Sequence, residues 1–131
     1  MIGLDTNVLL RILVDDGSPQ VATARRFAVE QTGAGHMLYV DQIVLVEAVW
    51  LLESVFAYGK AQVVAALDAL LNNASYVVER RDSAAAAWTK FRDGTADYSD
   101  CLIAANHAAA GCAFTATFDR AMRELPTTRI L

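Results

Sequence analysis

The sequence predicts an α/β fold, a three-layer sandwich in which helices cover a mostly parallel central sheet. The first observation behind this prediction is that short apolar runs suited to β-strands alternate with longer runs of helical periodicity, which is typical of parallel sheets. The second is size, because 131 residues without a repeat or a linker suit one compact core. We therefore expect a single domain over residues 1–131.

The first half of the chain contains strands and helices in alternation. In order, we expect a strand at 2–5, a helix that Asp5-Thr6-Asn7 begins and that continues to Leu13, a helix at 20–31, a strand at 37–40, and helices at 42–56 and 60–71. The helix at 42–56 is apolar nearly all round, so we expect it in the core or at an oligomer interface.

The second half continues the alternation. In order, we expect a strand at 76–78, helices at 83–92 and 97–110, a strand at 112–117, a helical turn at 118–123 and a strand at 129–131. Ligands of parallel α/β sheets bind at the carboxyl ends of the strands. Asp5 and Asp119 both follow an expected strand, so we expect both acids at that functional edge.

The charge of the chain limits its partners. A formal net charge of −4 argues against a general polyanion binder, because phosphate contacts normally come from excess Lys and Arg. A local group of arginines can still bind phosphate, and Arg11, Arg120 and Arg123 are the candidates. The apolar stretch at 43–52 is interrupted by Glu47 and shorter than the roughly 20 residues that span a bilayer. We expect no membrane helix and, because the first residues lack a basic leader, a cytoplasmic protein.

Glu47 needs an explanation because its neighbours on a helix are all apolar. They are Ile43, Val44, Trp50 and Leu51. Burial in such surroundings would raise the pKa of an unpaired carboxyl group. One interpretation is a core Glu that pairs with a distant Arg. The other is a functional acid that acts together with further acids.

Further acids also have two interpretations each. Asp5 is either a helix cap or a ligand, although Thr6 and Asn7 would cap the same helix equally well. Asp97 is either a cap or a supporting acid, and we favour Asp100, near the positive helix start, as a ligand. Asp119 is either a turn residue or a ligand.

A cluster of these carboxylates would require a cation, because the negative charges would otherwise repel one another. Oxygen ligands favour Mg²⁺, with Mn²⁺ as a substitute. Zinc is disfavoured, because His107 is the only histidine near the acids in sequence and the cysteines lack ligand spacing. We expect Cys101 and Cys112 to be buried free thiols, and we assign no role to His36 or His107.

Four sequence blocks contain these acids and their polar neighbours. The blocks are Met1 to Arg11, Val44 to Trp50, Asp97 to Ala105 and Thr117 to Arg120. In composition and order they resemble the PIN-domain ribonucleases, and in particular the VapC-type toxins of bacterial and archaeal toxin–antitoxin pairs. The resemblance covers nearly the whole chain.

The resemblance implies a PIN-like fold and a magnesium-dependent ribonuclease that hydrolyses RNA phosphodiester bonds. It assigns the catalytic and metal-binding roles to Asp5, Glu47, Asp100 and Asp119. It assigns supporting roles to Asn7, Thr6, Thr117 and Asp97. The family often has another acid shortly after the last block, where this chain has Ala121 and Met122. A homodimer and a cognate antitoxin that covers the site are also implied, and the helix near Trp50 to Phe56 could form either contact or be buried in the core.

Two other functions are compatible with the same acids. A housekeeping RNA-processing PIN nuclease would have no antitoxin. A receiver-like, magnesium-binding signalling domain would need an acceptor acid at the end of a central strand, such as Asp41, and a late lysine. No lysine follows Lys90, which disfavours the receiver.

Overall fold

The computed structural model describes residues 1–131. Its internal contacts divide the chain into two compact units, Met1–Glu79 and Arg80–Leu131. Each unit combines helices with a parallel sheet of its own, three-stranded in the first and two-stranded in the second. The α/β class with parallel strands is therefore confirmed.

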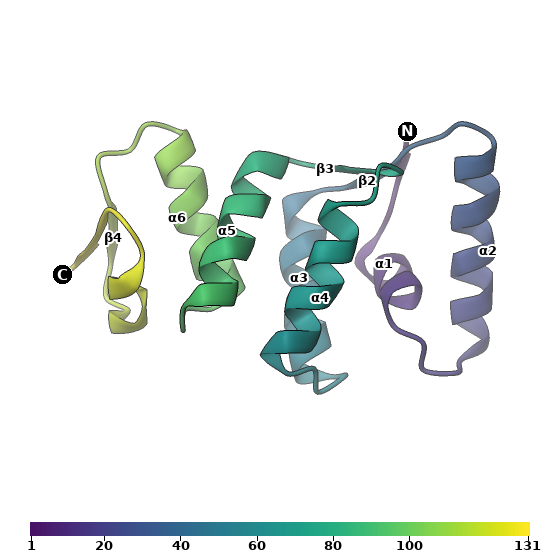
Figure 1. The fold of residues 1–131 in the computed structure, drawn as a ribbon, viewed down its shortest axis with the longest axis horizontal. Coiled ribbons are helices and arrows are strands. Elements are labelled where there is room, and N and C mark those ends of the chain that lie inside the picture. Colours follow the sequence, from purple (N-terminus) through teal and green to yellow (C-terminus); the bar gives the residue numbers. More distant parts are fainter. The chain divides into compact units, whose positions relative to one another are not determined.

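The first unit follows a strand–helix–helix pattern twice and ends on a strand. Its elements are β1 (Ile2–Gly3), α1 (Thr6–Leu13), α2 (Pro19–Gly33), β2 (Leu38–Val40), α3 (Gln42–Ser54), α4 (Lys60–Leu71) and β3 (Tyr76–Val78). The strands lie in the order β1-β2-β3, with Ile2 opposite Leu38 and Leu38 opposite Tyr76. Helix α1 packs on α2 and α3, and α3 packs on α4 (Figure 1).

The core of this unit is made of aliphatic side chains from strands and helices. Leu9, Val40, Leu45 and Val63 are completely buried. The helices begin where the sequence places good caps: Asp5 accepts from the backbone N–H of its neighbour at the start of α1, and Pro19 opens α2.

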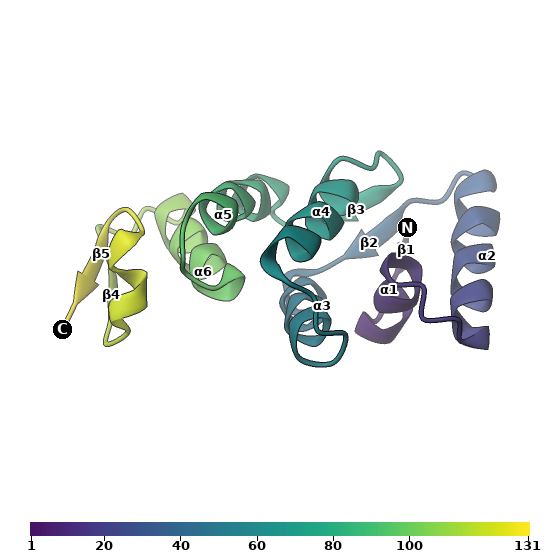
Figure 2. The same cartoon turned by 60° about the horizontal axis from the view of Figure 1, so that its bottom comes forward.

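The second unit is a helix pair followed by a small sheet. Its elements are α5 (Arg81–Asp93), α6 (Tyr98–Ala109), β4 (Thr115–Thr117), the 3₁₀ helix η1 (Arg120–Glu124) and β5 (Thr128–Ile130). Strands β4 and β5 are parallel, with Thr115 opposite Thr128 (Figure 2).

Tyr98 joins the two helices of this pair. Its ring meets the Phe91 ring edge to face, with centroids 5.9 Å apart, and its hydroxyl donates to the carbonyl of Ala84 at 3.0 Å. Burial raises the pKa of the Tyr98 hydroxyl above its ordinary value. Helix α6 ends before Gly111, whose φ of +85° is a conformation that glycine adopts without strain.

Several element bounds differ from the sequence-based expectations. Strand β1 ends at Gly3 rather than at residue 5, α3 ends at Ser54, and β4 begins only at Thr115, because the chain from Cys112 onward is a loop before pairing with β5 starts. Cys101 is buried as expected, but the expectation for Cys112 was wrong, since it is exposed in that loop. Helix α3 is buried on one side only, with Ile43 and Trp50 exposed by 72% and 65%.

Candidate active site

An acid follows each strand of the three-stranded sheet. Asp5 comes after β1, Asp41 after β2 and Glu79 after β3. The last two both serve the start of α3, since Asp41 accepts the N–H of Val44 at 2.8 Å and Glu79 accepts the N–H of Gln42 at 2.9 Å. These helix N–H groups would otherwise lack partners, which gives Asp41 and Glu79 a structural role.

Asp5 differs from these two acids because it also borders a cavity. One of its oxygens accepts the N–H of Thr6 at 2.8 Å. The side chain is exposed and, together with Asn7 and Arg11, lines a cavity of about 570 Å³ between α1 and α2. Asp5 is therefore both the cap of α1 and a group that a ligand could reach.

Glu47 is linked to this region through Thr6. The buried Thr6 hydroxyl donates to a Glu47 carboxylate oxygen at 3.5 Å, so the residue after Asp5 contacts Glu47. Glu47 is exposed and forms no ion pair. The interpretation of Glu47 as a core acid paired with an Arg was wrong, because the outer face of α3 turns it to solvent between the exposed Ile43 and Trp50.

Asp100, Asp119 and Asp97 form the second group of predicted acids, in the Arg80–Leu131 unit. Asp100 lies in the first turn of α6 and is partly buried. Its pKa is raised, first by burial and then by the negative charges of Asp119 and Asp97. The charges of Asp119 and Asp97 therefore act on Asp100, which shows that the three acids are near one another.

Asp119 is held by its own turn. Its backbone N–H donates to the Thr117 hydroxyl at 3.0 Å, and its side chain accepts the N–H of Ala121 at 2.9 Å. Thr117, a predicted supporting residue, therefore orients the backbone of Asp119. Asp97 precedes α6 at the cap position, but its side chain makes no capping hydrogen bond, which contradicts the cap interpretation of Asp97.

Glu124 contributes to this region although the sequence analysis did not identify it. Its carboxylate accepts the backbone N–H groups of Thr95 and Ala96, both at 2.6 Å, and the Thr95 hydroxyl at 3.2 Å. These bonds join η1 to the loop before Asp97. A Cβ on Gly94 would lie 2.6 Å from the same carboxylate and 3.0 Å from the Lys90 carbonyl, so a larger residue there would push the Glu124 carboxylate from its place. Only the contact itself, and no local pattern, could have pointed to Glu124.

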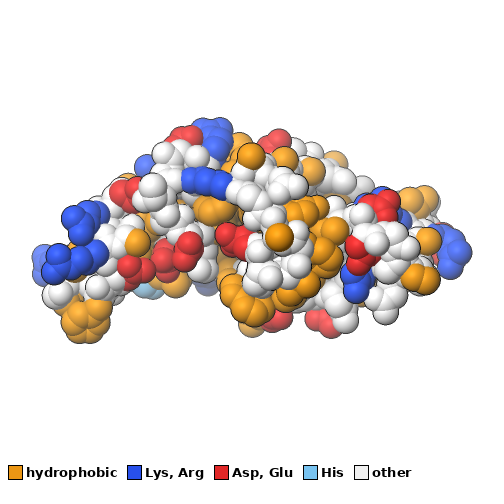
Figure 3. Space-filling view, turned by 90° about the horizontal axis from the view of Figure 1, so that it is seen from below, with side chains coloured by type: hydrophobic (Ala, Val, Ile, Leu, Met, Phe, Trp, Pro, Cys, Tyr) orange, Lys and Arg blue, Asp and Glu red, His pale blue; other side chains and the backbone are white.

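The predicted phosphate-binding arginines are in different settings. The Arg11 guanidinium donates to Asp16 and Gln20, at 2.8 and 3.0 Å. Arg120 and Arg123 are exposed in η1. Basic side chains gather over η1 and β5 (Figure 3), next to Asp119 in sequence.

No group of three or more His, Cys, Asp or Glu side chains is arranged in this structure to hold a metal ion. Neither histidine had been assigned a role: His36 is exposed, and His107 contacts the Thr115 hydroxyl at 2.9 Å and so ties α6 to β4. The chemistry of the acids nevertheless fits a hard cation, because the mutual repulsion around Asp100 is what a bound cation would relieve.

A comparison with known protein families matches residues 2–127 to the PIN domain. The chain belongs to the PIN domain family. The match covers most of both units and, apart from Met1, all four sequence blocks. PIN domains are generally nucleases and typically use divalent metal ions. The carboxylates of this PIN domain suit such metal-dependent chemistry. The receiver-like alternative loses its support, because Asp41, its proposed acceptor, caps α3.

A search of curated proteins finds no match to this PIN domain. None of its helices has the length and apolar character needed to cross a membrane.

Proposed function

We propose that this PIN-domain protein is a magnesium-dependent ribonuclease that hydrolyses RNA phosphodiester bonds, with Mn²⁺ able to replace Mg²⁺. Its activity depends on Asp5, Glu47, Asp100 and Asp119. The observation that carries the proposal is the match of residues 2–127 to the PIN domain family, a range that contains all four acids. Perturbed carboxyl groups cluster at functional sites, so the pKa of Asp100, raised by burial and by the charges of Asp119 and Asp97, supports binding of a cation.

The chain's own residues would divide the work as follows. Asp5, Asp100 and Asp119 would supply carboxylate oxygens to the metal, and Glu47, which is exposed and bonded only to Thr6, would orient the attacking water or hold a second ion. When bound, the ion would lower the pKa of a water molecule and neutralise charge that develops on the phosphate.

Three polar residues would keep these acids in place. The Thr6 hydroxyl holds the Glu47 carboxylate, and the Thr117 hydroxyl holds the backbone of Asp119. Asn7, exposed beside Asp5, would support the carboxylate or contact the phosphate. Arg120 and Arg123 would contribute phosphate contacts that weaken as salt rises.

The test is cleavage of RNA by Asp5→Asn, with Asp41→Asn as the matched control. Both residues follow a strand and cap a helix, and Asn caps about as well as Asp, so both variants should fold. We expect Asp5→Asn to reduce cleavage at least about 100-fold, as losses of a catalytic charge commonly do, and Asp41→Asn to stay near wild type. Full activity of folded Asp5→Asn would refute the proposal.

We further propose that the protein is the toxin of a VapBC-type pair, acts in the cytoplasm, forms a homodimer and is inhibited by a cognate antitoxin. Support comes from α3, where the exposed Ile43 and Trp50 flank Glu47 and offer apolar area for a partner. Expression should arrest growth, and a neighbouring gene should relieve the arrest while its product co-purifies. Unimpaired growth with active enzyme would favour the housekeeping nuclease instead.

A further inference from the structure

The cavity between α1 and α2 has features that the proposed chemistry does not use. Its volume of about 570 Å³ lies within the range of small-molecule sites. Asp5 and Asn7 line one part of it. The rest extends away from these residues, between apolar side chains and a small set of polar groups from both helices.

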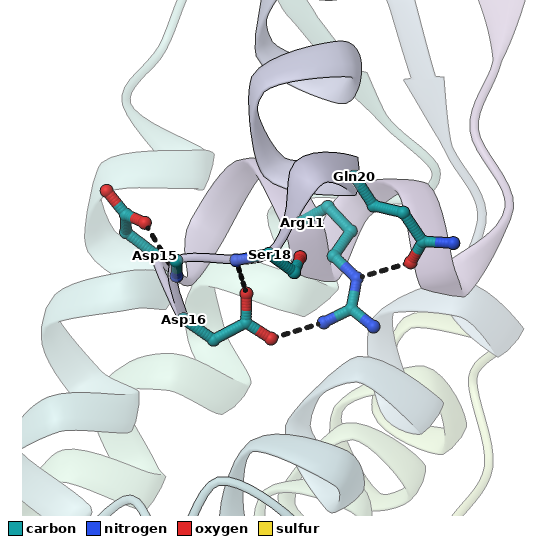
Figure 4. Close-up of polar contacts among 6 residues, drawn as sticks. Arg11, Asp15, Asp16, Ser18 and Gln20 are labelled. Atoms are coloured by element: carbon teal, nitrogen blue, oxygen red, sulfur yellow. Dashed lines mark hydrogen bonds and ion pairs between the residues drawn. The ribbon is translucent and has the colours of Figure 1, made fainter.

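The polar groups are held in place by a hydrogen-bond network (Figure 4). Arg11 donates through Nε to the amide oxygen of Gln20 and through Nη1 to Asp16. Asp16 is itself fixed by the backbone N–H of Ser18, which donates to it at 3.0 Å and is the chief cause of its lowered pKa. The guanidinium is therefore oriented before any ligand arrives.

This network leaves two NH2 groups without a hydrogen-bond partner on residues that line the cavity. Arg11 keeps its Nη2 group, and Gln20 keeps its amide nitrogen because its oxygen already accepts from Arg11. Asp16 balances the positive charge of Arg11, which weakens any general attraction for phosphate. Arg11 and Gln20 therefore offer hydrogen-bond donors in fixed directions. A ligand that suits them presents adjacent acceptor atoms.

The apolar side chains that line the cavity could pack against the flat face of a ligand ring. Phe27 and Ala24 of α2 lie opposite Val8 of α1 in the lining. Single-stranded RNA is commonly recognised through unstacked bases that pack on aromatic side chains while their edges are read by hydrogen bonds. Phe27 follows Gln20 by about two helical turns in α2, so an aromatic wall and fixed donors border the same cavity and could provide both contacts.

We propose that this cavity binds a nucleobase of the RNA substrate next to the phosphate that is cleaved, with Phe27 packing on the base and Arg11 and Gln20 reading its edge. This inference rests on the proposed ribonuclease function, since it is Asp5 that places the cavity beside the reaction. Guanine fits best because its O6 and N7 are neighbouring acceptors on a two-ring base. Cytosine also presents neighbouring acceptors, O2 and N3, but its single ring offers Phe27 less area. Uracil presents separated acceptors, and adenine presents a donor beside N7, so both should bind more weakly.

Binding of the nucleoside monophosphates to the full chain tests the inference without requiring catalysis. Amide NMR shifts are followed in EDTA as GMP, UMP, CMP or AMP is added. We expect GMP to shift amides of α1 and α2 most, and Gln20→Ala to weaken GMP binding about 3- to 10-fold, the cost of one hydrogen bond. Gln31→Ala is the matched control, because Gln31 also lies in α2 but does not line the cavity.

A second variant blocks the cavity instead of removing a donor. Thr23 is exposed and lines the cavity, so Thr23→Phe should fill it without disturbing the core. We expect Thr23→Phe to abolish GMP binding and to reduce any preference for a guanine beside the cleavage site. The inference is overturned if no nucleotide shifts these amides, if GMP shifts only other regions, or if a partner protein alone occupies the cavity. Normal RNA cleavage in that case would leave the proposed function intact.

Discussion

The ionised carboxyl group of Asp100 is less stable in the folded protein than in water. Burial, and then the charges of Asp119 and Asp97, raise its pKa above the ordinary value of 3.8. In the unfolded chain the same carboxyl ionises at its ordinary pKa, so the unfolded state releases this proton more readily. The ionised form of Asp100 therefore opposes folding, and the opposition grows as pH rises from 3.8 through the raised pKa.

Asp100→Asn should stabilise the metal-free protein at neutral pH, because it removes the charge and keeps the shape. Below pH 3.8 the carboxyl is largely protonated in both states and the gain should vanish; above the raised pKa it should be complete and constant. We expect a rise in Tm on the order of 2 °C at pH 7, measured by circular dichroism in EDTA across this pH range.

Asp82→Asn is the control for this measurement, because Asp82 also lies in the first turn of a helix, here α5. An acid at that position favours folding through the positive helix start, so its removal should leave Tm unchanged or lower it. A lower Tm for Asp100→Asn than for wild type at neutral pH would contradict the repulsion among the three acids.

Glu124 acts at the scale of whole elements, because one carboxylate connects η1 to the loop between α5 and α6. Glu124→Ala would leave the backbone N–H groups of Thr95 and Ala96 without their acceptor. We expect a loss of about 1–3 kcal/mol in the free energy of unfolding, measured by urea denaturation. RNA cleavage should also fall, since this loop leads to Asp97 and the start of α6.

Glu30→Ala separates this effect from the loss of a surface charge. Glu30 is exposed and reaches Arg26 only at 4.0 Å, so its replacement should change stability by less than about 0.5 kcal/mol. Equal effects of the two replacements would show that the Glu124 contacts do not hold the loop.

The elements that the sequence predicted best are those with clear local signals at both ends. Helix α4 and strand β3 have the bounds that were expected, because Gly59 separates α4 from the preceding helix and the strand is a short β-branched and aromatic run. Strand β4 was predicted too long, since Cys112 to Phe114 are apolar enough to look like a strand but have no partner to pair with. Strand ends depend on the partner strand, which local sequence does not specify.

For the molecule as a whole, the sequence motifs predicted the family, but they did not predict the burial and hydrogen-bond partners of single residues. Four sequence blocks were enough to place the chain in the PIN domain family. They did not predict that Glu47 is exposed, that Glu124 binds a distant loop, or that Asp41 and Glu79 are both used to cap α3. Burial and long-range hydrogen bonds depend on packing between segments far apart in sequence, so a pattern read along the chain contains little of this information.

The proposed function requires acids from both Met1–Glu79 and Arg80–Leu131, and the response of Tm to Mg²⁺ measures whether they serve one ion. Binding to the folded state alone stabilises it, by about 2.7 kcal/mol when the free ion is at 100 times its Kd. We expect Mg²⁺ to raise the Tm of wild type and of Asp41→Asn alike. If one ion depends on both groups of acids, Asp5→Asn and Asp119→Asn should each remove most of that rise. Loss of the rise in only one of the two variants would show that the carboxylates do not share an ion and would limit metal binding to the acids of one unit.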